Sequence, residues 1–295
     1  MSQTSGAALR LPPDSGRTLE LGYTGPAGRR RFWLHVPPHR IAGRRPLVVL
    51  LHGGFQTAPE FVTVTAMSHL ADRYDVMVAY PQQNRKANPQ RFWNWFQPEH
   101  QKAGTGEPAI LAGIAEQVVL DWDADPERVF VAGFSAGGAM AAVLAATYPE
   151  RFAAVGVHSG IGYRAADDVY SGLQVTQYGG SPAPLPNTVP LIVFHGGRDS
   201  TVAPVNAAQL VTSRLVNVPG VTSERADVPA VDGVRAHSVT VHRDNAGALQ
   251  TEAWSVPAGG HAWFGGAAGV SYADPMGPSA SAEMLRFFLE QRPDR

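Results

Sequence analysis

The chain has 295 residues, a length that allows one large domain or two small ones. Hydrophobic residues make up 44% of the chain and charged residues 17%, as in an ordinary globular protein with a sizeable core. With 24 basic against 25 acidic residues the formal net charge is -1, so neither nucleic acid nor a membrane is expected as a partner. Cysteine is absent, which excludes disulfides, thiolate nucleophiles and cysteine-ligated metals.

The first 20 residues are poor in large apolar side chains. We therefore expect residues 1–20 to form a mobile tail ahead of a single domain at 21–295. The tail lacks the apolar segment of a secretory signal, and no apolar run in the chain approaches the roughly 20 residues of a membrane span. The sequence thus predicts a cytoplasmic protein, or a secreted one whose leader has been removed, and it leaves the oligomeric state open.

From residue 46 onward, predicted strands alternate with predicted helices. Residues 46–51 and 76–80 are continuous apolar runs, typical of strands buried on both faces of a parallel sheet. Further strands are predicted at 31–36, 128–132, 153–158, 191–195, 238–243 and 252–256, and helices at 59–71, 108–122, 136–147, 205–215 and 280–291. This alternation predicts an α/β fold, with a mostly parallel central sheet and helices on both faces.

Two long segments interrupt the alternation. Residues 84–106 are predicted to form an irregular loop that carries Trp93 and Trp95. Residues 160–188 show no periodicity and contain several tyrosines, glycines and prolines. Because loops of this length in compact domains are usually functional, we expect the second segment to pass near the functional site.

Residues 133–137 read Gly-Phe-Ser-Ala-Gly, which has the form G-x-S-x-G. A predicted strand precedes this sequence and a predicted helix follows it. That is the context of a nucleophile elbow, in which a strained turn presents a serine hydroxyl above the sheet. A tight packing turn with an incidental serine is the alternative. We predict Ser135 as a nucleophile.

A serine hydroxyl needs a base to remove its proton, and in α/β-hydrolases the partners follow in the order serine, acid, histidine. His158 and His195 end apolar strands, where a structural histidine is expected. His237 and His242 lie in an alternating strand that favours solvent exposure. His261 instead lies in a glycine-bearing loop after the last large strand, where an imidazole could reach the elbow. We predict His261 as the base.

Asp199 follows the predicted strand 191–195 and so lies at the carboxyl end of a sheet strand, on the same edge as the elbow. A carboxylate there could hold the imidazole in one tautomer and stabilise the imidazolium. A local pair with Arg198 is the alternative interpretation. We predict Asp199 as the acid.

Charge that develops on a carbonyl oxygen during acyl transfer needs preorganised hydrogen-bond donors. One donor is expected to be the backbone N–H of Ala136, the residue after the nucleophile. The second is expected from the loop His52-Gly53-Gly54-Phe55, with Gly54 as the first choice and Phe55 as the alternative.

The chain resembles the poly(3-hydroxybutyrate) depolymerase family of esterases. The matching stretches run in order from about residue 30 onward, and they are 51–56, 80–83, 93–96, 104–108, 133–140, 195–199, 260–263 and 284–288. The Trp-Asn-Trp-Phe and Gly-Glu-Pro pieces are more specific than the elbow. The resemblance implies Ser135, Asp199 and His261 as a catalytic triad, the same residues that the motif and its context indicate.

The chain also departs from that family. Members often carry cysteine where Gly54 and Phe92 stand, so the resemblance implies that a bridge has been lost as a unit. Glu107, in the Gly-Glu-Pro piece, is expected to anchor a loop rather than to catalyse. Four aromatic residues are candidates for the walls of a substrate cleft, although paired tryptophans are more often core: Phe55, Trp93, Trp95 and Trp263.

These features predict a serine esterase that works through an acyl-enzyme, on poly(3-hydroxybutyrate), its oligomers or other short-chain esters. A feruloyl or acetyl-xylan carboxylesterase on the same scaffold is the alternative, because substrate choice depends on loops rather than on fold. A catalytically silent hydrolase fold that serves as a binding module is a third interpretation. The sequence has no metal, nucleotide or flavin motif, so no cofactor and no metal are expected.

Overall fold

The structure is a computed structural model that describes residues 16–38, 43–186 and 188–291. Ten strands form one sheet in the spatial order β1-β2-β4-β3-β5-β6-β7-β10-β9-β8. They are β1 (Arg17–Gly25), β2 (Gly28–Val36), β3 (Arg45–Leu51), β4 (Met77–Pro81), β5 (Ala124–Phe134), β6 (Ala154–His158), β7 (Leu191–Gly196), β8 (Thr222–Val228), β9 (His237–Arg243) and β10 (Leu249–Val256). Two short strands, β11 (Trp263–Phe264) and β12 (Ala273–Asp274), pair separately. The helices are α1 (Ala58–Thr65), α2 (Met67–Tyr74), α3 (Gly106–Trp122), α4 (Ala136–Thr147), α5 (Val169–Tyr178), α6 (Val205–Leu215), α7 (Ala280–Glu290) and a single 3-10 turn, η1 (Pro98–His100).

The centre of the large sheet is parallel. Strands β4, β3, β5, β6, β7 and β10 each pair in parallel with the next strand in that order. Antiparallel strands extend the sheet at both edges, β2 and β1 on one side and β9 and β8 on the other. The central strands are buried on both faces, which is why their sequences are nearly continuous apolar runs.

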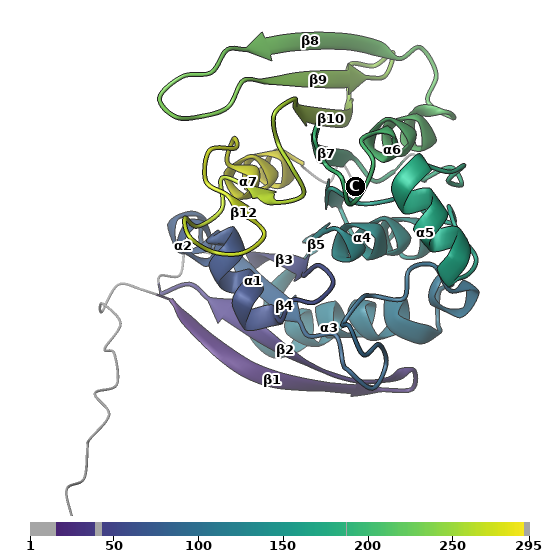
Figure 1. The fold of residues 1–295 in the computed structure, drawn as a ribbon. Coiled ribbons are helices and arrows are strands. Elements are labelled where there is room, and N and C mark those ends of the chain that lie inside the picture. Colours follow the sequence, from purple (N-terminus) through teal and green to yellow (C-terminus); the bar gives the residue numbers. More distant parts are fainter. Residues whose placement is uncertain (1–15, 39–42, 187, 292–295) are drawn as a thin grey trace, which may run out of the picture.

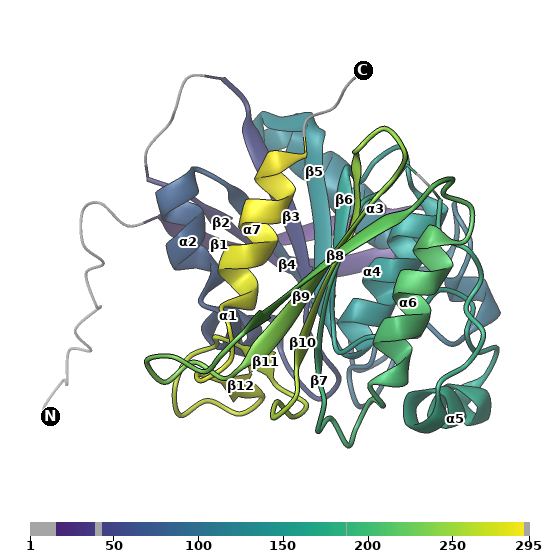
Figure 2. The ribbon, with the colours of Figure 1, turned by 90° about the horizontal axis from the view of Figure 1, so that it is seen from above.

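Helices cover both faces of the sheet (Figures 1 and 2). Helices α1, α2 and α7 lie on one face, and α3, α4 and α6 lie on the other. Neighbouring residues of one strand belong to opposite apolar clusters, as Val48 and Val49 of β3 do. The α/β architecture predicted from the sequence, with a mostly parallel sheet between two helical layers, is confirmed.

The helix predicted at 59–71 is two helices in the structure. Ala66 takes a left-handed conformation, with φ of 48°, which ends α1 and begins α2. The Thr65 hydroxyl donates to the Phe61 carbonyl at 2.9 Å and accepts from the Met67 N–H at 3.3 Å. Local side-chain bonds of this kind compete with the helical ladder, and the apolar spacing gives no sign of them.

The first strand begins inside the segment that was predicted to be a mobile tail. β1 starts at Arg17 and pairs with β2 along its whole length. The prediction of a tail is therefore wrong for residues 17–20, while residues 1–15 lie outside the described part of the chain. Leu19 and Leu21 are half-buried with exposed neighbours, which is the alternation of a strand with one covered face.

Besides β1 and the short elements η1, β11 and β12, two elements were not predicted, β8 and α5. β8 is exposed at every position, so its sequence carries no apolar alternation. α5 lies within the segment 160–188, which was expected to be irregular. Only Gly172 and Val175 of this helix are buried, and two buried positions leave little periodicity to detect.

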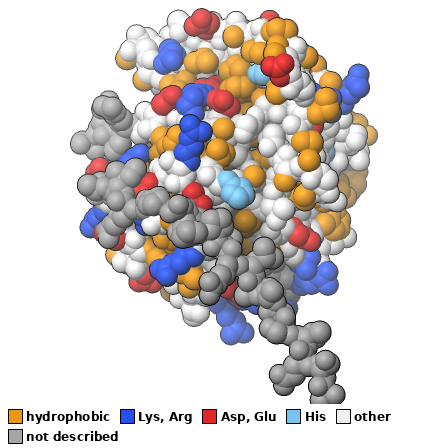
Figure 3. Space-filling view, turned by 90° about the vertical axis from the view of Figure 1, so that its left-hand side faces the viewer, with side chains coloured by type: hydrophobic (Ala, Val, Ile, Leu, Met, Phe, Trp, Pro, Cys, Tyr) orange, Lys and Arg blue, Asp and Glu red, His pale blue; other side chains and the backbone are white. Residues whose placement is uncertain are grey.

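The face drawn in Figure 3 carries acidic, basic and apolar side chains interspersed with one another. Its described residues form no continuous basic stripe of the kind that follows a nucleic-acid backbone. No described helix combines the length and the apolar composition needed to cross a membrane.

Strand β5 and helix α4 approach each other closely through two glycines. A Cβ added to Gly133 would lie 2.3 Å from the carbonyl group of Gly137. A Cβ added to Gly137 would lie 2.2 Å from the Leu51 carbonyl oxygen and 2.5 Å from that of His52. Backbone atoms cannot rotate away as a side chain can, so these positions require glycine for packing.

The substitution Gly137→Ala is expected to lower the free energy of unfolding by about 3 kcal/mol, because the new methyl group would push α4 away from β3. Urea unfolding measures this loss. Gly22→Ala is the matched control, since no described heavy atom lies within 4 Å of its added Cβ. Equal stability of the two variants would contradict the close approach.

Candidate active site

Ser135 lies in the sharp turn between β5 and α4. Its backbone has φ of 55° and ψ of -120°, a strained combination for a residue other than glycine. The Ser135 N–H donates to the His158 carbonyl at 2.9 Å, which ties the turn to the end of the neighbouring strand β6. This is the geometry of a nucleophile elbow, as the sequence predicts.

His261 and Asp199 complete a hydrogen-bonded chain that begins at the serine. The Ser135 Oγ lies 3.0 Å from Nε2 of His261, and Nδ1 of the same ring lies 2.7 Å from Oδ2 of Asp199. The serine and the histidine are 126 residues apart in sequence, and the aspartate and the histidine are 62 apart. The three side chains therefore meet only because β5, β7 and β10 end at the same edge of the sheet.

Of the three side chains, that of Asp199 is the most deeply buried, with no exposed surface. Burial by itself would raise the pKa of the carboxyl group. The hydrogen bond and charge of His261, together with the Val202 N–H at 2.8 Å, outweigh burial and lower the pKa of Asp199 below its ordinary value of 3.8. The Thr201 N–H also donates to Oδ1, at 2.9 Å. The carboxyl group is thus held ionised and in one orientation.

The two alternatives for the second oxyanion donor differ in the structure. The Phe55 N–H donates to the Gln90 carbonyl at 2.7 Å, so this donor is already occupied. Gly54 is therefore favoured over Phe55 on the loop after β3. On the other side of the elbow, Ala136 begins α4, and the first N–H groups of a helix have no partner within the helix.

A cavity of about 440 Å³ opens above the elbow. Ser135 and Ala136 form part of its wall, and the rest comes from the loop before α3, from the segment after β6, from α5 and from the segment after Asp199. Most of the lining side chains are apolar; they include Phe92, Trp95, Phe96, Ile161, Val169 and Leu173. The expectation that the 160–188 segment passes near the site is confirmed, because α5 forms one wall.

The four aromatic candidates for cleft walls have different surroundings. Trp95 lines the cavity. Trp93 and Trp263 are fully buried, and their indole N–H groups donate to the His52 carbonyl and to Ser281 Oγ, both at 3.0 Å. The prediction of a cleft wall is therefore wrong for these two, which belong to the core. Phe55 is 55% exposed and contacts the lining residue Phe92 edge-to-face.

Residues 31–232 match the family model described as esterase PHB depolymerase. The chain belongs to this family. It is 31% identical over 251 residues to poly(3-hydroxyalkanoate) depolymerase C of Paucimonas lemoignei, covering 79% of this chain and 58% of that protein. It is also 28% identical over 210 residues to acetylxylan esterase A of Talaromyces purpureogenus, covering 63% of this chain and 53% of that protein.

The chain thus spans about half the length of the curated relatives that it matches. Among solved structures it resembles an acetyl xylan esterase from Aspergillus awamori, with a TM-score of 0.70 and 19% sequence identity over 92% of this chain and 99% of that one. At this level of sequence identity, the similarity shows a shared fold only. The fold is that of the α/β-hydrolases, as predicted.

The sequence patterns did not identify most of the residues that line the cavity at Ser135. Val169 and Leu173 of α5 are 59% and 61% exposed, and both line the cavity. They are four residues apart, which is the spacing of one helix face and is the signal that could have placed a helix here. Phe92 and Phe96 flank the tryptophan pair, and nothing in their local sequence distinguishes them from core residues.

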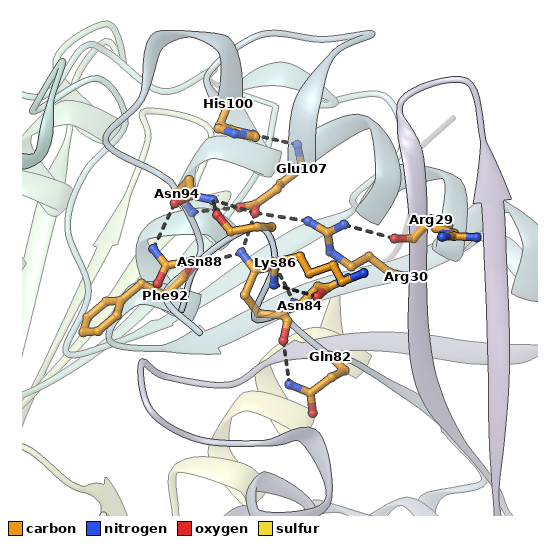
Figure 4. A network of polar contacts seen from close by, with 12 residues as sticks. Arg29, Arg30, Gln82, Asn84, Lys86, Asn88, Phe92, Asn94, His100 and Glu107 are labelled. Carbon is orange, nitrogen blue, oxygen red and sulfur yellow. Dashed lines mark hydrogen bonds and ion pairs between the residues drawn. The ribbon is translucent and has the colours of Figure 1, made fainter. Parts of the chain in front are cut away.

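Glu107 supports the loop that forms part of the wall, as predicted for an anchor. Its carboxylate is 1% exposed and accepts from the Asn94 N–H at 2.7 Å and from Nδ2 of Asn94 at 2.9 Å. It also accepts from Nε2 of Gln83 and pairs with Arg30 at 3.3 Å. Figure 4 shows Arg30 of β2 and Asn94 of the loop after β4 converging on the Glu107 carboxylate at the start of α3.

His52 and His158 are fully buried next to the site and serve as hydrogen-bond acceptors. Nε2 of His52 accepts from the Gln83 N–H at 3.0 Å, and Nε2 of His158 accepts from the Phe264 N–H at 3.1 Å. Burial lowers the pKa of His52 to about 4 and that of His158 well below the ordinary value of 6.5. Both rings are therefore neutral in the folded protein.

Stability is expected to fall as the pH drops from about 6.5 to about 4. In this window the two histidines take up protons in the unfolded chain but not in the folded one, so acid favours unfolding. His52 alone contributes about 3 kcal/mol to the free energy of unfolding. This contribution is fully present above pH 6.5 and is lost as the pH falls to about 4. Urea unfolding at pH 7, 6 and 5 measures the slope. His52→Asn removes one of the two groups and should reduce the slope; a flat stability profile in the parent would contradict the assignment.

Proposed function

We propose that this chain is a serine esterase in which Ser135 is the nucleophile, His261 the general base and Asp199 the residue that orients and stabilises the imidazole. The observation that carries the proposal is the unbroken chain from Oγ through the imidazole to a buried carboxylate, at 3.0 and 2.7 Å, placed in a strained elbow. Membership in an esterase family supports the same conclusion.

In the proposed acylation step, Oγ of Ser135 attacks the carbonyl carbon of the ester while Nε2 of His261 takes the hydroxyl proton. The carbonyl oxygen becomes negatively charged, and the N–H groups of Ala136 and Gly54 are the donors that we propose to stabilise it. The imidazolium then gives its proton to the departing alkoxide oxygen, which releases the alcohol and leaves an acyl-enzyme. Water, deprotonated by the same imidazole, attacks the acyl carbon and releases the acid and the free serine.

Asp199 enters this cycle as a fixed negative charge. Its carboxylate faces the imidazole nitrogen that is remote from the serine, so it favours the tautomer with a proton on Nδ1. The same charge stabilises the imidazolium that forms after each proton transfer. The lowered pKa of Asp199 means that this charge persists well below neutral pH.

As the substrate class we propose poly(3-hydroxybutyrate), its oligomers and other short-chain esters. The cavity of about 440 Å³ with mostly apolar walls suits an aliphatic acyl chain. The relative from Paucimonas lemoignei is named a poly(3-hydroxyalkanoate) depolymerase, which supports this class. Acetylated or feruloylated xylan is the second candidate, supported by the likeness to acetylxylan esterase A.

The variant Ser135→Ala is expected to lower kcat by at least about 10⁴-fold while the fold persists, because one hydroxyl is removed and no buried contact is lost. A fluorophosphonate probe followed by mass spectrometry of the labelled peptide measures the reactivity of the serine directly. The probe should modify the parent at Ser135 and leave the variant unmodified. Modification of another serine in the parent would refute the assignment.

The proposed substrate class predicts an order of rates among soluble esters. We expect hydrolysis of a 3-hydroxybutyrate trimer and of p-nitrophenyl butyrate at least about tenfold faster, in kcat/KM, than hydrolysis of methyl ferulate or of acetylated xylo-oligosaccharides. Product release followed by chromatography at equal ester concentration gives these values. Faster cleavage of the xylan-derived esters would favour the second candidate.

A further inference from the structure

A second cavity, of about 710 Å³, lies beside the first. Strands β1 and β2, the loop after β4 and the start of α1 form its walls. The loop 84–92 contributes to both cavities. Gln90 and Phe92 line the cavity of Ser135, whereas Arg85 and Arg91 line the second one.

The lining of the second cavity is strongly basic. It contains five arginines and no aspartate or glutamate, although the whole chain has a formal charge of -1. They are Arg29, Arg30, Arg31, Arg85 and Arg91. Such a concentration of one charge in a concave surface raises the local concentration of anions.

Only two of these arginines have a carboxylate partner among the described residues. Arg31 pairs with Glu20 at 2.9 Å on the exposed surface, and Arg30 pairs with Glu107 at 3.3 Å. The carboxylate of Glu60, in the first turn of α1, accepts a hydrogen bond from the Thr57 N–H at 2.7 Å. Three arginines, Arg29, Arg85 and Arg91, are thus left to face the cavity without a described carboxylate.

The floor of the cavity is rigidly built. The Arg30 side chain is only 10% exposed, and its Nη1 donates to the Arg29 carbonyl at 3.0 Å (Figure 4). Its Nε is buried and has no hydrogen-bond partner within the described residues. Glu107, which holds the other end of this guanidinium, also holds Gln83 and Asn94 of the adjoining loop. The network therefore fixes both the arginine and the loop that separates the two cavities.

Resting on the function proposed above, we propose that this cavity is a subsite for the free carboxylate of a 3-hydroxyacid oligomer whose ester bond lies over Ser135. Arginine guanidinium groups match carboxylates with two parallel hydrogen bonds. Each hydrolysis of such a polyester leaves a chain with a carboxylate end. Gln90 and Arg91 are consecutive residues that line different cavities, so an oligomer that crosses this loop passes from the apolar cavity to the arginines. Half-buried Trp33, which also lines this cavity, offers apolar surface to its aliphatic part.

The test is isothermal titration of the Ser135→Ala variant, in which turnover is blocked, with a 3-hydroxybutyrate tetramer as the free acid and as its methyl ester. We expect the acid to bind at least about tenfold more tightly than the ester. Adding Arg29→Gln or Arg85→Gln should weaken binding of the acid about tenfold and leave binding of the ester unchanged. Arg225→Gln is the matched control, because Arg225 is exposed on β8 and lines neither of these two cavities.

Equal affinity for acid and ester in Ser135→Ala alone, or an equal loss for both ligands when an arginine substitution is added, would overturn the proposal. Titration with inorganic phosphate is a parallel arm: arginine-dependent binding of phosphate without any preference for the acid tetramer would also overturn it. Turnover of p-nitrophenyl butyrate, which has no carboxylate, is measured separately with Ser135 intact. It should be unchanged by Arg29→Gln and Arg85→Gln, and its absence in the parent would refute the esterase itself rather than the subsite.

Discussion

The site depends on the contact between the start of α4 and the backbone of β3 and β5. Ser135 can hold φ of 55° only if the helix that follows it is pressed onto the sheet, and this requires that residue 137 have no side chain. Because the turn is held from both sides, the Ser135 side chain projects from the carboxyl edge of the sheet instead of joining the helix. Strands β7 and β10 end at that edge too, so the loops that follow them carry Asp199 and His261 to the serine. A single close approach of backbone to backbone thus determines where three distant residues meet.

A second constraint is the burial of polar groups around that edge. His52, His158 and Glu107 have almost no exposed surface, yet each is satisfied by backbone or amide partners. The two histidines are neutral acceptors, whereas Glu107 is paired with Arg30. Burying such groups is costly unless they are hydrogen-bonded, so each one specifies a single arrangement of the loop that it binds. The glutamate has the wider effect, since the loop 84–92 that it supports borders both cavities.

Sequence patterns predicted the parts of this molecule that repeat a simple rule. Continuous apolar runs located the parallel strands, and the order of elements placed the loops carrying Ser135, Asp199 and His261 at one edge, where the structure brings them within hydrogen-bonding distance. The predictions that failed concern residues whose surroundings are formed by neighbours distant in sequence. Trp93 and Trp263 are core residues because Trp93 binds a carbonyl on the loop after β3 and Trp263 a hydroxyl on α7, and neither partner can be identified from local spacing. α5 and the basic cavity were missed for the same reason. The exposed apolar residues of α5 and the five arginines can be recognised as cavity linings only once the fold has brought the walls of each cavity together.

Gly54 and Phe92, the two positions where the resemblance implies a lost bridge, show how such neighbours constrain one another. Gly54 and Phe92 touch in the structure: a Cβ added to the glycine would lie 2.5 Å from the phenylalanine ring. The ring fills the space that a side chain at position 54 would need, so neither residue can change alone without a clash or a void. The loop is instead held by the Phe55 N–H on the Gln90 carbonyl at 2.7 Å and by the edge-to-face contact of Phe55 with Phe92. Contacts of this kind hold the loop after β3 without a covalent link, and they place the Phe92 ring in the wall of the cavity, where it bounds the space available to the substrate.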